Sequence, residues 1–398
     1  MKSIAHPAPD ETTEAAPESA RQAHGRNLSL DRARTFLTVI VVIHHAVIPY
    51  TYFGHTDPKS WLGFDMIVLA TDSFFMAMFF FLSGLFVWPS LARRVPGVFT
   101  YDRLLRLGLP FAVAALTVIP IAYYALALRE NPDLRFGAFW WNMVTVGPWP
   151  SGPVWFVWVL LVFDLAAGAL YRISSNALNW INRLSLRGFD QPALFFAVLA
   201  GVTALAYVPM RVIFGPTHWL EFGPFSVQTS RVFLYALYFF IGAGIGVGSF
   251  SKGVLSVDGR LAKSGWGWAV VTLIPYAGLW GLIVIKREVL GNPDTLPMWY
   301  EAAYGVLFVI FSAAMMFTIL AFFLRFKRDG RSILDPMQHD AYGIFLVHYA
   351  FVLWVQYAML DLDWPAVVKA LAAFVATIAL SWIATRLLRK IPGSQRVL

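Results

Sequence analysis

Long apolar runs separated by short polar segments dominate the chain from about residue 35 to residue 387. Ten of the runs are long enough to cross a hydrocarbon core of roughly 30 Å at about 1.5 Å per helical residue. This pattern predicts an all-α polytopic membrane protein with about ten transmembrane helices. The expected spans cover approximately residues 35–53, 62–88, 106–128, 153–171, 192–213, 229–249, 265–285, 300–324, 341–360 and 365–387.

The composition supports a membrane protein. Hydrophobic residues make up 58% of the chain and charged residues 14%, against about 25% charged residues in an ordinary soluble domain. Many of the 16 tryptophans lie near the ends of apolar runs, as in the aromatic belts at headgroup depth. The chain contains no cysteine, which excludes disulfides, thiol chemistry and thiolate metal ligands.

The basic residues indicate an orientation. Most of the 31 lysines and arginines fall in the six segments on one side of the ten predicted spans. Because positive charge is retained on the cytoplasmic side, both termini are predicted to be cytoplasmic. This placement accounts for the net charge of +8 without a nucleic-acid partner. We expect a multi-pass protein of the inner, or plasma, membrane that contacts membrane lipids.

Three regions are expected from the distribution of apolar residues. Residues 1–29 are rich in Ala, Pro, Glu, Thr and Ser, which is typical of a disordered cytoplasmic tail and not of a secretory signal. Residues 30–390 form the membrane domain, and residues 391–398 a short cytoplasmic tail.

The first predicted span carries charges and two adjacent histidines within an apolar run, LDRARTFLTVIVVIHHAVIPYTY (residues 30–52). Arg34 and His45 are eleven residues apart, about three helical turns, so they share one stripe roughly 16 Å apart along the axis. His44 lies about 100° off that stripe, which favours packing or support over direct chemistry. An ionisable group deep in a membrane costs about 2.5–3.5 kcal/mol and usually marks a functional cavity.

Asp72 in the second span and His348 in the ninth are predicted at a similar depth. By depth alone, these side chains and His45 could meet in one cavity. Each also has a structural interpretation, because His348 could satisfy an interhelical hydrogen bond and Asp72 could orient a neighbouring helix. The pair of adjacent histidines without further close ligands is a weak metal signal, so no metal is expected.

Two motifs lie near the cytoplasmic ends of the second and third spans. Ser83 and Gly84 in FFFLSGLF (residues 79–86) predict either close helix contact through small residues or the approach of a ligand. Arg103 and Arg106 in YDRLLRLGLPF (residues 101–111) are three apart on one helix face. They could form a fork for phosphate, or serve topology and lipid headgroups.

Together with GPVWFVWVLLVFDL (residues 152–165) and SILDPMQHDAYGIFLVHYAF (residues 332–351), these motifs occur in an order that resembles the acyltransferase 3 family of integral membrane acyltransferases. The resemblance implies a ten-helix core that moves an acyl group from cytoplasmic acyl-CoA to a hydroxyl, commonly of a carbohydrate or glycosylated acceptor. It further implies that His45 is the catalytic histidine, Arg34 its motif partner, and Arg103 and Arg106 the donor-binding pair.

These motifs lead to a mechanistic hypothesis. His45 acts as general base on the acceptor hydroxyl, oriented by Asp72 or His348, while the pantetheine arm of the donor passes Ser83 and Gly84. Trp155 and His348 are candidates to stabilise the oxyanion, and an acyl-histidine intermediate is an alternative. Acyl-CoA, with an acetyl, succinyl or similar group, is a co-substrate, and no permanently bound cofactor is expected. The rival hypothesis is a transporter or flippase for a lipid-linked or small polar substrate, which would consume no acyl-CoA.

Overall fold

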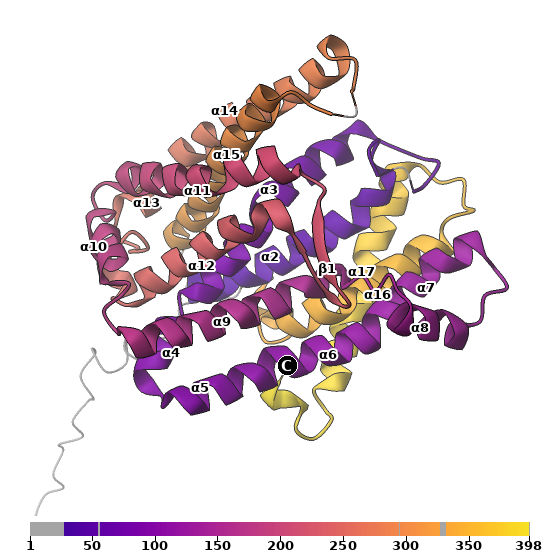
Figure 1. Cartoon of the computed structure of the whole chain (residues 1–398), viewed down its shortest axis with the longest axis horizontal. Coiled ribbons are helices and arrows are strands. Elements are labelled where there is room, and N and C mark those ends of the chain that lie inside the picture. Colours follow the sequence, from indigo (N-terminus) through magenta and orange to yellow (C-terminus); the bar gives the residue numbers. More distant parts are fainter. Residues whose placement is uncertain (1–27, 55, 294, 327–331, 398) are drawn as a thin grey trace, which may run out of the picture.

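The computed structural model describes residues 28–54, 56–293, 295–326 and 332–397. Within them, ten helical segments are long and apolar enough to cross a membrane, which confirms the predicted all-α polytopic class. Figure 1 shows these helices packed side by side around α2 and α3. The predicted N-terminal tail lies outside the described residues, except that α2 already begins at Leu28.

Several spans consist of more than one helical element. The spans and their elements are α2 (Leu28–Val47) with a 3-10 turn (Ile48–Tyr50); α3 (Leu62–Gly84) with α4 (Val87–Arg93); α5 (Pro96–Arg103), α6 (Leu109–Leu116) and α7 (Val118–Glu130); a 3-10 turn (Gly152–Val154) with α9 (Trp155–Ile173); α11 (Pro192–Phe214); a 3-10 turn (Thr229–Arg231) with α12 (Val232–Gly246); α14 (Gly265–Val284) with a π turn (Ile285–Val289); α15 (Met298–Arg325); α16 (Ala341–Ala358); and α17 (Ala366–Leu388). The connections contain α8 (Phe136–Thr145), α10 (Asn179–Arg187), α13 (Arg260–Lys263) and the strands β1 (Trp219–Phe222) and β2 (Phe225–Gln228).

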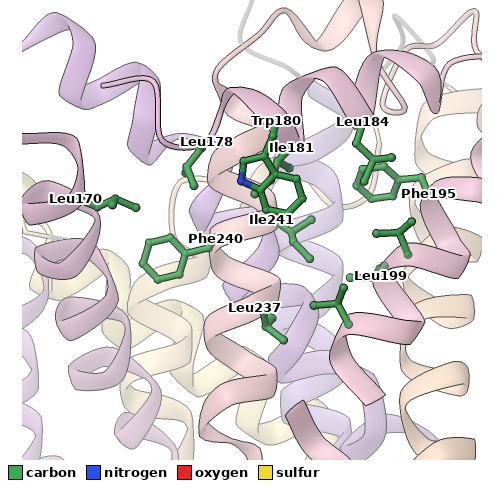
Figure 2. Close-up of a pocket in the computed structure, with 12 residues that line it drawn as sticks. Leu170, Leu178, Trp180, Ile181, Leu184, Phe195, Leu199, Leu237, Phe240 and Ile241 are labelled. Atoms are coloured by element: carbon green, nitrogen blue, oxygen red, sulfur yellow. The ribbon is translucent and has the colours of Figure 1, made fainter. Parts of the chain in front are cut away.

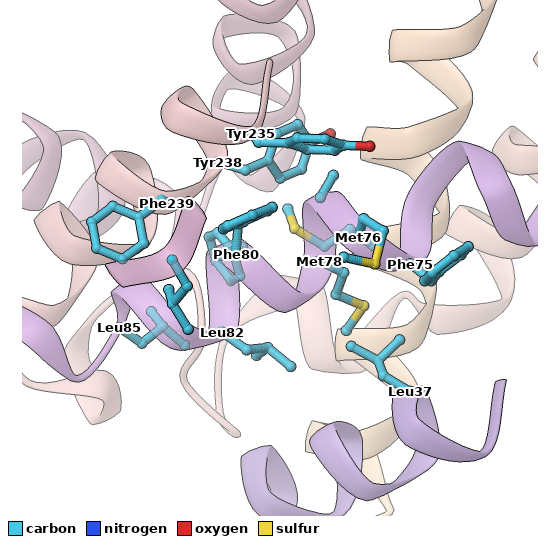
Figure 3. Close-up of a cluster of buried hydrophobic side chains, with 14 of the residues drawn as sticks. Leu37, Phe75, Met76, Met78, Phe80, Leu82, Leu85, Tyr235, Tyr238 and Phe239 are labelled. Carbon is cyan, nitrogen blue, oxygen red and sulfur yellow. The ribbon is translucent and has the colours of Figure 1, made fainter. Parts of the chain in front are cut away.

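Helices α3 and α12 approach each other through glycines. A Cβ added to Gly84 would lie 2.0 Å from the carbonyl oxygen of Phe239, and one added to Gly242 would lie 2.2 Å from that of Phe81. Small residues permit this close backbone approach between membrane helices. Large apolar side chains of both helices surround the contact, including Phe80 of α3 and Phe239 of α12 (Figure 3). This rigid pair supports one wall of the site described below.

The third span is broken where proline removes a backbone donor. Helix α6 ends at Leu116 and α7 begins at Val118, because Pro120 has no N–H to donate to the carbonyl four residues earlier. The indole of Trp140 in α8 donates to that Leu116 carbonyl at 2.8 Å. The break turns α7 so that Tyr123 reaches the site.

A short antiparallel hairpin, which the apolar runs did not predict, joins α11 to α12. Trp219 pairs with Gln228 and Phe222 with Phe225, and Gly223 in the two-residue turn has φ +54°, as primed hairpin turns require. The hairpin contacts α9 (Figure 1), where Trp158 donates to the carbonyl of Ser226 at 3.0 Å. It lies in a segment predicted to face the outer side.

At the opposite end of the bundle, two aspartates anchor the start of α16. Asp335 accepts hydrogen bonds from Arg32 of α2 at 2.8 and 2.9 Å, and this interaction outweighs burial and lowers the pKa of Asp335 to about 2. Burial opposes ionisation of Asp340, but hydrogen bonds from Trp382 of α17 and from Arg389, which directly follows α17, outweigh it and lower the pKa of Asp340. These contacts fix α16 between α2 and α17.

Candidate active site

A cavity of about 320 Å³ lies beside His44 and His45, and we call it the central cavity. Its walls come from α2, α3, α7, α9, α12, α16, the hairpin and the loop before α9. They consist of Val41, His44, His45, Asp72, Phe75, Met76, Tyr123, Pro150, Ser151, Gly152, Pro153, Trp155, Trp219, Glu221, Ser226, Gln228, Arg231, Tyr235, Phe345 and Tyr349. The cavity therefore combines apolar walls with a few convergent polar groups, as small-molecule sites do.

His45 and His348 are brought together as the sequence predicts. Their ring centroids are 5.3 Å apart, and the ring of His348 is fully buried. His348 Nδ1 lies 2.7 Å from the carbonyl oxygen of Phe345; because a carbonyl only accepts, Nδ1 carries the proton. Nε2 therefore presents its lone pair, and this atom has no hydrogen-bond partner among the described residues.

His45 is close to the end of its helix. Helix α2 ends at Val47, so His45 lies nearer the hairpin end of the bundle than the end that carries Arg34. The side-chain amide of Gln356 donates to the His45 carbonyl at 2.9 Å, and the ring of Tyr349 lies 5.1 Å from that of His45. The sequence analysis did not identify Gln356 or Tyr349, although Tyr349 directly follows His348.

His44 is held by α3. The hydroxyl oxygen of Thr71 lies 2.7 Å from His44 Nδ1 and 2.8 Å from the carbonyl oxygen of Ile67. When that hydroxyl donates to the carbonyl, it accepts from His44 Nδ1. His44 borders the central cavity while α3 fixes its orientation, which agrees with a supporting role beside His45.

Asp72 is engaged by an arginine that the sequence analysis missed. Arg231 forms two bonds to the carboxylate, at 2.9 and 2.5 Å, and a third to the Asp72 carbonyl at 3.2 Å. This pairing, and not a contact with His45, accounts for the intramembrane carboxylate. A sequence signal existed, because Arg231 begins an apolar span on the predicted outer side, where the positive-inside rule disfavours arginine.

Three arginines named by the motifs lie at the other end of the bundle. Arg34 donates to the carbonyl of Leu82 at 2.8 Å. Arg103 pairs with the buried carboxylate of Asp164 at 3.2 Å, and Arg34 and Arg103 repel each other electrostatically. Arg106 is exposed and follows Arg103 across a π-helical turn (Leu104–Gly108). The extra residue in such a turn moves Arg106 off the face of Arg103.

The remaining motif residues divide between packing and the cavity. Gly84 lies against the backbone of α12, so its role is to allow the close contact between these two helices. Ser83 beside it is half-buried. Trp155 borders the central cavity and stacks on Tyr235 with ring centroids 5.4 Å apart. Among the described residues, no three His, Asp or Glu side chains converge as metal ligands do.

A separate apolar cavity of about 220 Å³ lies between α10, α11 and α12 (Figure 2). Trp180, Phe195 and Phe240 are among its walls, and it shares no lining residue with the central cavity. Its walls contain no ionisable or nucleophilic group, so the central cavity is the better candidate for a reaction site.

Comparison with known proteins identifies a family. The model of a family described as an acyltransferase domain matches residues 27–386, nearly the whole chain. No curated protein and no solved structure matches the chain.

Proposed function

Because the chain belongs to the acyltransferase 3 family, we propose that it is an inner-membrane O-acyltransferase. It moves an acetyl, succinyl or similar group from acyl-CoA to a hydroxyl of a carbohydrate or glycosylated acceptor, with His45 as general base. The observation that carries this proposal is that His45 lines the central cavity with its ring 5.3 Å from that of His348, whose Nε2 has no hydrogen-bond partner among the described residues.

The two histidines have complementary roles. During the reaction, a ring N–H of His45 is to turn towards Nε2 of His348 and donate to it, so that the other ring nitrogen of His45 keeps its lone pair for the acceptor hydroxyl. As that nitrogen takes the proton, the hydroxyl oxygen attacks the thioester carbonyl carbon. The tetrahedral intermediate then expels the CoA sulfur, which receives the proton from His45. His348 stabilises the transient imidazolium, as the carboxylate does in a catalytic triad.

The developing oxyanion requires donors within the cavity. Arg231 and the indole of Trp155 both border it. Asp72 partly neutralises the guanidinium of Arg231 and holds it in a fixed orientation. A preorganised donor of this kind stabilises charge without reorganising during the reaction.

The donor phosphates are assigned to the end of the bundle that carries Arg34, Arg103 and Arg106. Asp164 offsets the charge of Arg103 and Asp31, 4.0 Å from Arg34, offsets that of Arg34, so the three arginines keep a net positive charge for the CoA phosphates. The exposed Arg106 offers the first contact from solution, and Arg103 the deeper one. The acyl arm then reaches the central cavity past the aromatic side chains of α3 and α16.

The direct test is a transfer assay with purified protein in nanodiscs. [14C]acetyl-CoA and [14C]succinyl-CoA are supplied with a panel of methyl glycosides, and free CoA and labelled ester are measured. The proposal expects CoA release that depends on the protein, together with a labelled ester. Translocation of a substrate across proteoliposomes without CoA release would instead support a transporter.

A further inference from the structure

A second cavity, of about 230 Å³, adjoins the central cavity at His45. The two cavities share His45 and Tyr349 as lining residues. The remaining walls of the second cavity are Ile48, Pro49, Tyr50, Thr56, Asp57, Leu126, Arg129, Leu353, Gln356, Tyr357 and Leu360. Its position gives a second ligand its own access to the catalytic ring.

Two buried polar atoms in this cavity lack a partner among the described residues. These atoms are the hydroxyl oxygen of Tyr50, a fully buried residue, and Oε1 of Gln356, which is 8% exposed. The amide nitrogen of Gln356 donates to the carbonyls of His45 and Ala46, at 2.9 and 3.4 Å. This fixes the amide, so Oε1 faces away from the helix. Buried polar atoms are normally hydrogen-bonded, so both atoms need a partner that the described residues do not supply.

The charged groups beside these atoms are already engaged. Asp57 pairs with the buried Lys369 at 2.9 Å, and Lys369 also donates to the carbonyl of Leu360 at 3.2 Å. Arg129 donates to the carbonyl of Thr56 at the exposed rim. The charge of Arg129 has no carboxylate partner among the described residues and lies at the exposed rim, whereas the two unpartnered atoms inside the cavity are neutral, which favours a neutral ligand there.

The ligand chemistry follows from the two atoms. Oε1 of Gln356 only accepts, whereas the hydroxyl of Tyr50 both donates and accepts. A hydroxyl group on the ligand can form a hydrogen bond with either of these two atoms. At about 30 Å³ per water molecule in the liquid, the cavity has room for roughly eight waters, which matches one sugar ring and not an oligosaccharide.

We infer that the second cavity binds a single neutral sugar ring of the acceptor, held by Tyr50 and Gln356, and directs one of its hydroxyls to His45. This inference rests on the proposed acyl transfer and adds the place and size of the acceptor subsite. The donor thioester then occupies the central cavity, and the two substrates meet where the cavities adjoin, beside the rings of His45 and Tyr349.

Substitutions at Tyr50 and Leu360 test this assignment, each with a matched control. Tyr50→Phe removes only an oxygen that bonds no described residue, so the fold is retained, and Tyr52→Phe is the control because Tyr52 is exposed in the same loop. Leu360→Trp fills the cavity, and its control is Leu362→Trp at an exposed position two residues away.

The probes are [14C]acetyl-CoA and the methyl glycosides of glucose, galactose, mannose and rhamnose. Using the glycoside that the wild type esterifies best, Tyr50→Phe should raise KM for the sugar about fivefold or more, as expected for one lost hydrogen bond, and leave kcat within twofold. Leu360→Trp should abolish ester formation and still bind acetyl-CoA. Both controls should match the wild type.

The alternative outcomes are distinct. If the wild type releases no CoA, the proposed function fails and this inference fails with it. The inference alone is overturned if CoA is released but no glycoside is esterified. An unchanged sugar KM in Tyr50→Phe, or ester formation by Leu360→Trp at the wild-type rate, would also overturn it while the proposed function stands.

Discussion

Exchange of His348 for asparagine or glutamine separates the two hydrogen-bonding positions of its ring. Asparagine places an amide near Nδ1 and retains a donor to the Phe345 carbonyl, which lies 2.7 Å from that atom. It provides no acceptor at the position of Nε2. Glutamine does the reverse, because its amide oxygen reaches the position of Nε2. The pair therefore tests whether the acceptor facing His45 matters for catalysis.

The expected magnitude follows from the charge that His45 gains. A hydrogen bond to a charged group contributes about 1.5–3 kcal/mol, and about 1.4 kcal/mol corresponds to a factor of ten in rate. His348→Asn should therefore lower kcat about 10- to 100-fold, with little change in KM for either substrate. His348→Gln should retain substantially more activity than His348→Asn.

The assay is steady-state release of CoA with purified variants of matched thermal stability. His218→Asn serves as the control, because His218 is exposed and bonds to Thr229 outside both cavities. A purely structural role predicts the opposite order, in which His348→Asn is better tolerated because it keeps the bond to Phe345. That order, or equal activity of the two variants, would refute the assigned role of His348.

Three further predictions concern the donor end, the loop before α16 and the contact between α3 and α12. Arg103→Ala should weaken acetyl-CoA binding about tenfold, and the exposed Arg187→Ala should not, as measured by equilibrium binding. Asp335, whose pKa is lowered to about 2 by Arg32, contributes stability at pH 5 that is lost as the pH falls from about 4 to 2. Because solvent reaches Asp335, Asp335→Asn should lower the free energy of unfolding by about 1 kcal/mol at pH 5 and by almost nothing at pH 2. Thermal melts of the variant and the wild type at both pH values would show or exclude this convergence. Gly84→Ala should prevent recovery of folded protein, because its Cβ meets a backbone oxygen at 2.0 Å, whereas Gly201→Ala in open space should yield monodisperse protein by gel filtration.

Properties set by local sequence could be predicted well. The ten spans follow from the lengths of apolar runs, and all ten are present. The eleven-residue spacing of Arg34 and His45 places both on α2, because helix geometry is local. The position of a residue along its helix can therefore be predicted from the sequence. However, α2 ends at Val47, which places His45 nearer the end of its helix than the apolar run suggests.

Lateral neighbours could not be predicted in the same way. Asp72 was considered as a partner for His45, but Arg231, 159 residues away, holds it. The apolar runs give no information on which helices are adjacent, since membrane helices associate through packing and small residues and not through distinctive hydropathy. The same reason explains why Gln356 and Tyr50 were missed. Their importance lies in unpartnered atoms, which only the packed structure shows.

The central claim is that His45 takes the proton of the acceptor hydroxyl. The most direct measurement is the rate of acyl transfer by His45→Ala, compared with the wild type after both proteins are shown to be monodisperse and to bind [14C]acetyl-CoA. General base catalysis contributes about 10²- to 10⁴-fold, so kcat should fall at least 100-fold while donor binding persists. Transfer by His45→Ala within tenfold of the wild-type rate would contradict the account.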